Sequence, residues 1–182
     1  MKNYPQYSTK QKWIHWLTAI LVFLAILLPL LRGSLAQYLS GMANLFVLHK
    51  SLGIMVFILT VWRIIVIIKQ GIPEVQPKHE KLQRILSKSV QGIIYLLLLI
   101  LPLSGYLMSS RDIHFLGFIT LPALTLPNGV YGVFHSVHII GAYLLIFLLC
   151  LHVLAAFYHH LWVKDNVLKS MLPSRWFNSF YR

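Results

Sequence analysis

The chain has 182 residues, of which 58% are hydrophobic and 11% are charged, and its formal net charge is +12. A soluble domain carries about 25% charged residues, so this composition indicates an integral membrane protein. No folded basic module accompanies the positive charge, and we therefore exclude nucleic acid as a partner. The charge instead predicts attraction to anionic lipid headgroups.

Four apolar segments are long enough to cross a bilayer: residues 13–31, 45–68, 89–108 and 135–162. A segment inside lipid must satisfy its backbone polar groups internally, so each should be a helix. We predict an all-α fold, an integral membrane four-helix bundle that forms one domain over residues 1–182.

The first span carries an interfacial signature. Trp13 and Trp16 flank His15 at its start, as aromatic residues do at a membrane surface. The alternative is a cleaved signal peptide, because lysines precede the apolar run and the small residues Ser34 and Ala36 follow it. A histidine between two tryptophans is unusual in a discarded segment, and we expect a retained span.

Basic residues are distributed unevenly between the two sides of the predicted bundle. One side would hold Lys2, Lys10, Lys12, Arg63, Lys69, Lys78, Lys81, Arg84, Lys88, Lys164, Lys169, Arg175 and Arg182. The other side would hold Arg32, Lys50 and Arg111. Cytoplasmic loops carry the excess of Lys and Arg, so both termini should be cytoplasmic.

Four histidines fall at two predicted depths. His138 and His152 are 14 residues apart, which is about 1400° of helix rotation, so both point the same way and lie roughly 21 Å apart along the axis. The topology puts His15 at the inner depth of His152 and His49 at the outer depth of His138.

Histidines inside a membrane span are costly without a partner, which makes a functional role the default hypothesis. A single histidine on a helix face is more often a hydrogen-bonded packing residue. Two pairs that share a helix favour ligation instead, with room for two stacked haems, and bis-histidine iron suits electron transfer.

Other residues could contact the macrocycles or the propionates of these haems. Gly53 and Gly141 lie near the histidines and could leave space for a macrocycle, although small residues also pack helices together. Arg63 could pair with an inner haem propionate or extend to the headgroups. Lys50 and Arg111 are weaker candidates for the outer propionates.

The connections have distinct characters. Residues 69–88 should be a cytoplasmic connector in which His79 is solvated. Residues 109–131 are apolar enough to form a lid over the outer haem or to dip into the membrane interface. His159 should reach the inner surface beside His160, Lys164 and Asp165, and these titratable groups would suit proton-coupled quinone chemistry, or could simply be polar residues that end the helix.

Sequence motifs along nearly the whole chain resemble the bacterial cytochrome b561 family. They are KWIHWL, LHKSLGI, VWR, YLLLLILPLSG and LHVLAAFYHHLWVKDNVLKSML. The resemblance implies two non-covalent haem b groups in the bacterial inner membrane and electron transfer involving ubiquinone. In one branch of the family it implies oxidation of superoxide at the outer face.

The resemblance also implies site residues. His15 and His152 match ligands of the inner haem iron, and His49 and His138 match ligands of the outer haem iron. His159 matches a residue near the quinone, with Ser8 and Lys164 as neighbours.

Three functions follow as hypotheses. The first is a dihaem superoxide:quinone oxidoreductase. The second is a haem-bearing anchor or relay subunit for a separate dehydrogenase or soluble cytochrome. A haem-free transporter is the third, and it would give a colourless preparation.

Overall fold

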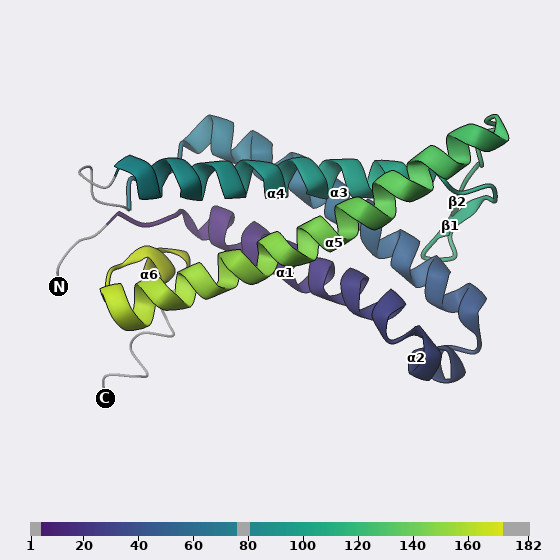
Figure 1. The fold of residues 1–182 in the computed structure, drawn as a ribbon, viewed down its shortest axis with the longest axis horizontal. Coiled ribbons are helices and arrows are strands. Elements are labelled where there is room, and N and C mark those ends of the chain that lie inside the picture. Colours follow the sequence, from purple (N-terminus) through teal and green to yellow (C-terminus); the bar gives the residue numbers. More distant parts are fainter. Residues whose placement is uncertain (1–4, 76–80, 173–182) are drawn as a thin grey trace.

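Four long helices account for most of the computed structural model, which describes residues 5–75 and 81–172 (Figure 1). They are α1 (Thr9–Leu30), α3 (Met42–Gln70), α4 (Lys81–Leu107) and α5 (Asn128–Tyr158). Each is long and apolar enough to cross a membrane, α5 together with the π-helix His159–Val163 that continues it. The predicted all-α membrane bundle is confirmed.

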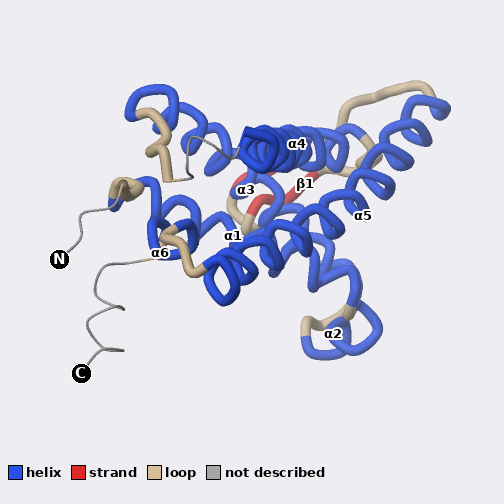
Figure 2. Tube along the Cα trace, turned by 60° about the vertical axis from the view of Figure 1, so that its left-hand side comes forward, coloured by secondary structure: helices blue, strands red, loops and turns tan. Residues whose placement is uncertain are grey.

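The shorter elements lie at the two ends of the bundle. Helix α2 (Arg32–Tyr38) and the antiparallel strands β1 (Ile113–Phe115) and β2 (Ile119–Leu121) lie at one end, and α6 (Val167–Met171) lies at the other (Figure 1). Strand β1 rests against α3, and β2 pairs with β1 (Figure 2). A helix-only chain was expected, so this small hairpin outside the spans is a departure from the prediction.

Local sequence explains where the helices begin and end. Ser8 caps α1 through a reciprocal pair of bonds: its Oγ accepts from the N–H of Gln11 at 3.2 Å, and its own N–H donates to Gln11 Oε1 at 2.9 Å. Helix α3 lies between Gly41 and Gly71, whose positive φ angles of 113° and 75° end the helical path at both termini.

The helices pack in a chain of neighbours: α1 against α3, α3 against α4, and α4 against α5. The core between them is aliphatic and comprises Leu21, Val22, Leu28, Leu45, Leu52, Val56, Ile94, Leu97, Leu98, Leu101, Leu145 and Leu148. Helices α1 and α5 approach each other less closely than these pairs, and α5 is the least covered of the four.

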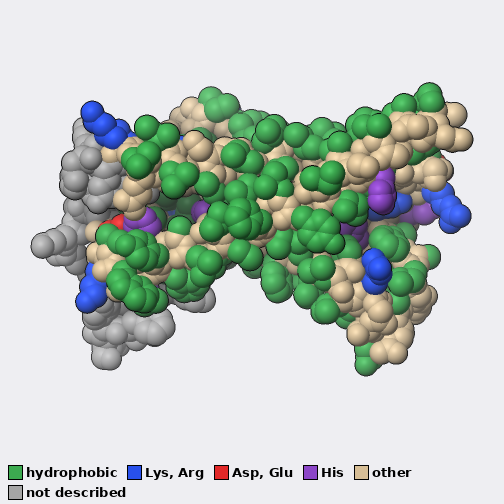
Figure 3. Space-filling model, in the orientation of Figure 1, with side chains coloured by type: hydrophobic (Ala, Val, Ile, Leu, Met, Phe, Trp, Pro, Cys, Tyr) green, Lys and Arg blue, Asp and Glu red, His purple; other side chains and the backbone are tan. Residues whose placement is uncertain are grey.

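Hydrophobic side chains dominate the middle of the outer surface, and the Lys and Arg side chains visible on this face lie at the two ends (Figure 3). This is the pattern expected of a lipid-facing belt between two polar surfaces. Helix α1 begins and α5 ends at the same end of the bundle (Figure 1). Which end faces the cytoplasm stays a prediction, and Lys2, Lys78, His79, Arg175 and Arg182 lie outside the described residues.

Two predicted boundaries were wrong. The connector expected over residues 69–88 is helical from Lys81, and α5 begins at Asn128, well before the predicted start at residue 135. The first turns of both helices are polar or rich in glycine, so hydropathy alone did not include them. The exposed side chains of Leu82, Ile85 and Leu86 show that the start of α4 lies outside the packed core.

Candidate functional site: two histidine pairs and a polar cluster

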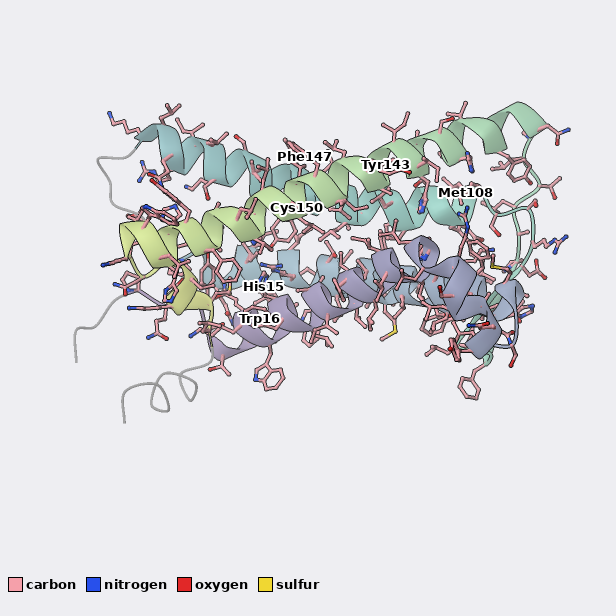
Figure 4. All side chains as sticks on the ribbon, turned by 60° about the horizontal axis from the view of Figure 1, so that its bottom comes forward. His15, Trp16, Met108, Tyr143, Phe147 and Cys150 are labelled. Carbon is pink, nitrogen blue, oxygen red and sulfur yellow. The ribbon has the colours of Figure 1, made fainter. Side chains whose placement is uncertain are left out.

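The two histidine pairs are called inner and outer after their predicted depths. The inner pair joins α1 to α5. The imidazole rings of His15 and His152 have centroids 6.4 Å apart and planes at 63°. His15 points into the bundle whereas its neighbour Trp16 points away from it (Figure 4). The Nδ1 atom of His15 is buried and has no hydrogen-bond partner among the described residues. A buried imidazole of this kind needs a further partner.

The outer pair joins α3 to α5. The rings of His49 and His138 have centroids 6.2 Å apart and planes at 83°. His49 Nδ1 lies 2.8 Å from the carbonyl oxygen of Ala25, and His138 Nδ1 lies 3.0 Å from that of Leu101. A carbonyl only accepts, so each Nδ1 carries the proton and each Nε2 keeps a free lone pair. Metal-binding histidines are commonly oriented in this way.

The spacing within both pairs would leave room for one metal ion between the two rings. Metal–nitrogen bonds of about 2 Å and a ring-centre-to-nitrogen distance of about 1.2 Å would separate the two centroids by about 6.4 Å. Within residues 5–75 and 81–172, no three His, Cys, Asp or Glu side chains form a metal-binding group. Each pair presents two imidazole rings, a donor set that suits haem iron.

The glycines near the outer pair have different roles. A Cβ on Gly53 would meet no atom within 4 Å, and Gly53 lines a cavity together with His49 and His138. A Cβ on Gly105 would lie 3.2 Å from His138 Cε1, so this glycine makes room for the ring itself. The contact between Gly105 in α4 and His138 in α5 is not apparent from residue spacing.

Gly141 packs against α4. A Cβ there would come within 2.9 Å of Leu101 Cδ2 and 3.7 Å of Leu97 Cδ2. This contact corresponds to the alternative role considered for Gly141, that of a small residue between two helices.

Arg63 lies beside the inner pair. Its guanidinium is 5.0 Å from the centre of the Tyr95 ring, and its charge acts on both His15 and His152. Burial raises the pKa of the Tyr7 hydroxyl outside the span, and the charge of Arg63 partly opposes that rise. A half-buried guanidinium beside two histidines can pair with an anionic group.

A polar cluster surrounds His159 at the end of α5. The His159 side chain is only 9% exposed, its Nδ1 contacts Asp165 Oδ2, and its Nε2 lies 2.8 Å from the amide nitrogen of Gln83. Lys164 adopts a left-handed conformation, with φ 56°, and its own side chain is exposed. From the sequence, Asp165 is expected near His159 as one of several titratable groups at the membrane surface. Its contact with Nδ1 and the approach of Gln83 from α4 are not apparent from residue spacing, because they depend on the turn at Lys164 and on where α4 begins.

Ser8 lies at the same end, on α1. Its Oγ donates to Gln70 Oε1 at 2.7 Å, which links the start of α1 to the end of α3. Helix α6 is held beside it, since Trp16 Nε1 donates to the carbonyl of Met171 at 3.0 Å and Lys12 Nζ to that of Leu172 at 3.0 Å.

The outer end is covered by the hairpin. The N–H of Leu116 donates to Ser51 Oγ at 3.0 Å, and Ile113, which is 3% exposed, lines the cavity beside His49. Lys50 Nζ donates to Ser109 Oγ at 2.8 Å. The segment thus contacts α3 beside the outer pair, and its role as a lid over a haem stays a prediction.

Comparison with known proteins agrees with this geometry. A family model described as prokaryotic cytochrome b561 matches residues 6–174. Cytochrome b561 homolog 1 of Escherichia coli K12 is 28% identical over 173 residues, which cover 93% of this chain and 98% of that protein. A probable superoxide oxidase CybB of Yersinia pestis is 30% identical over 179 residues, covering 94% and 98%.

Cytochrome b561 homolog 2 of Escherichia coli K12 is also 30% identical, over 175 residues that cover 93% of each chain. The matches span both histidine pairs and the polar cluster at His159. The chain therefore belongs to the prokaryotic cytochrome b561 family and is a multi-pass membrane protein that binds b-type haem.

Proposed function

We propose that this protein is a dihaem oxidoreductase of the bacterial inner membrane that passes electrons from superoxide at its outer end to ubiquinone at its inner end. The observation that carries the proposal is the arrangement of two histidine pairs at two heights, with α5 contributing to both. Bound haem would supply one-electron redox chemistry at each height.

The ligand assignment follows the pairs. His15 and His152 would hold the inner haem, and His49 and His138 the outer haem. Arg63 would hold an inner propionate, because its guanidinium lies beside the inner pair. Gly53 would leave space for the outer macrocycle, and Gly141 would let α4 and α5 approach closely around it.

The outer end would receive superoxide. Lys50 and Arg111 lie there, and a local positive potential steers an anion toward its site. The name of the Yersinia pestis relative, probable superoxide oxidase, supports the same donor.

The inner end would reduce quinone. His159, with Ser8 and Lys164 nearer the surface, would line this site at the lipid edge. In the overall reaction two superoxide ions lose one electron each and become two O₂, while one quinone gains two electrons and two protons and becomes the quinol.

The first test is the ratio of haem to protein, measured by pyridine haemochrome assay. We expect two haems per chain in the native protein and one in His138→Ala or His152→Ala. His135→Ala is the matched control, because His135 is an exposed histidine on the same helix. A ratio of zero or one in the native protein contradicts the four-ligand assignment.

The second test is turnover. Purified protein in proteoliposomes with ubiquinone should form quinol when superoxide is generated outside. A relay subunit would form quinol only after its dehydrogenase or soluble cytochrome is added, and it would co-purify with that partner.

A further inference from the structure

We propose that Asp165 and Gln83 form a hydrogen-bonded relay with His159, in which Asp165 fixes the tautomer of the imidazole and Gln83 occupies the nitrogen that a quinone oxygen would use. The inference rests on the proposed function, in which quinone is reduced beside His159. It makes Asp165 a residue that positions the imidazole, and Gln83 a residue that competes with quinone for Nε2.

Both ring nitrogens of His159 have a hydrogen-bonding partner. Its ring is buried, with Asp165 Oδ2 at Nδ1 and the Gln83 amide 2.8 Å from Nε2. The three side chains come from three separate places: the π-helical end of α5, the turn before α6 and the first turns of α4. No regular helix spacing would bring Asp165 back to His159.

The turn at Lys164 makes that return possible. Its φ of 56° reverses the chain, so that the N–H of Asp165 donates to the carbonyl of His159 at 3.2 Å. The carboxylate is then shared: Oδ2 faces His159, while Oδ1 accepts from the N–H of Val167 at 2.9 Å and begins α6. Asp165 therefore has a fixed position at the imidazole.

The chemistry follows from donors and acceptors. A carboxylate only accepts, so Nδ1 of the neutral ring carries the proton and Nε2 accepts from the Gln83 NH₂. When Nε2 is protonated, the Gln83 amide can rotate by half a turn and present its oxygen instead. Gln83 thus satisfies His159 in both protonation states while no quinone is bound.

A quinone oxygen would replace that amide oxygen. The Nε2 proton would move to the quinone oxygen as two electrons arrive from two superoxide ions, and the ring would return to its neutral form with Nδ1–H still on Asp165. A second proton, taken up from the aqueous side, would go to the other quinone oxygen, and a further proton from the same side would replace the one that left Nε2. Protons and electrons then match the overall reaction given above.

The test of the positioning role is the tautomer of His159. Native and Asp165→Asn proteins with ¹⁵N-labelled histidine are compared in lipid nanodiscs, in the haem-loaded and fully reduced state, and His159→Gln identifies the signal. We expect Nδ1–H in the native protein and Nε2–H in Asp165→Asn. An Asn can still accept from Val167 through Oδ1, so α6 should stay capped.

Asp112→Asn is the matched control, because Asp112 Oδ1 accepts from the backbone N–H of Ala123 at 2.7 Å on the outer side. It should leave the His159 signal unchanged. A native ring protonated at Nε2, or an Asp165→Asn spectrum identical to the native one, overturns the proposal.

Quinone kinetics test the two roles separately. Asp165→Asn should lower kcat by about 10- to 100-fold with little change in KM, as when a group that orients a reacting histidine is lost. Gln83→Leu should lower KM by about two- to tenfold at similar kcat, because one competing neutral hydrogen bond is removed. Gln91→Leu on the same helix, where Gln91 bonds only Ser87 among the interactions described, is the control.

A higher KM in Gln83→Leu would contradict the competing role and make Gln83 a quinone ligand. If the native protein reduces no quinone with any donor, the proposed function fails. The tautomer experiment still decides the role of Asp165 in that case, so the two failures are distinguishable.

Discussion

Buried imidazoles in this protein differ in what holds their Nδ1 atoms. His49 and His138 donate to carbonyls of neighbouring helices, at 2.8 and 3.0 Å, whereas His15 Nδ1 has no such partner among the described residues. A donor bond at Nδ1 fixes ring orientation and raises the basicity of Nε2. The outer pair is therefore the more rigidly oriented of the two.

Gly105 should control the orientation of His138. In Gly105→Ala the new Cβ would lie 3.2 Å from Cε1 and 3.3 Å from Nδ1, so the ring must shift. We expect a changed reduction potential for the outer haem and a loss of about 1 to 3 kcal/mol in stability from overpacking. Redox titration and thermal unfolding measure the two effects.

Gly92→Ala is the control on the same helix, since a Cβ there would meet nothing within 4 Å. It should leave both haem potentials unchanged and add up to about 1 kcal/mol of stability, the propensity difference between Gly and Ala. Equal potentials in Gly105→Ala and the native protein would contradict the steric role.

The pairing of the four histidines could be predicted from the sequence, but the residues that contact His159 could not. Counting residues along each span predicts depth, and depth alone pairs His15 with His152 and His49 with His138. The partners of His159 depend on the turn at Lys164 and on where α4 begins. Neither leaves a periodic signal in the sequence.

Among the elements, the hairpin is attached to the bundle by a side chain of α3. Ser51 is fully buried; its Oγ donates to the carbonyl of Val47 at 2.8 Å and accepts from the N–H of Leu116 at 3.0 Å. The hairpin therefore depends on a residue two positions after His49. Strand propensity did not predict it, because three-residue strands are too short to show alternation.

Ser51→Ala should loosen the hairpin without disturbing the spans. Loss of one neutral hydrogen bond should speed amide exchange over residues 113–121 by about two- to tenfold. Hydrogen exchange with mass spectrometry measures this. Thr60→Val is the control, because Thr60 Oγ1 donates only within α3, to Val56 at 2.7 Å. Unchanged hairpin exchange in Ser51→Ala would contradict the attachment.

For the whole molecule, the spans and their order could be predicted from hydropathy, and the side of the membrane can be predicted from charge. Basic residues at the ends of α3 and α5, such as Lys69 and Lys164, predict a cytoplasmic location for that end. The packed structure has the same internal contacts in either orientation, so the orientation needs its own experiment.

Labelling with a membrane-impermeant maleimide provides that experiment. The chain has one cysteine, so Cys150→Ala gives a cysteine-free background for single additions at exposed sites. In intact spheroplasts, Thr125→Cys in the outer connection should be labelled and Lys69→Cys should not. After lysis both should react. Labelling of Lys69→Cys alone before lysis would reverse the predicted topology.

Helix α5 supplies one histidine to each pair. If two haems bind as proposed, the spacing between their ligands on α5 would be set by the rise of one continuous helix, roughly 21 Å over 14 residues, and would be independent of how the bundle tilts. Bilayers of unequal thickness would change the inclination of that helix and leave the electron-tunnelling distance as it was. The rate of transfer between the haems should therefore be insensitive to the lipid chain length of the host membrane.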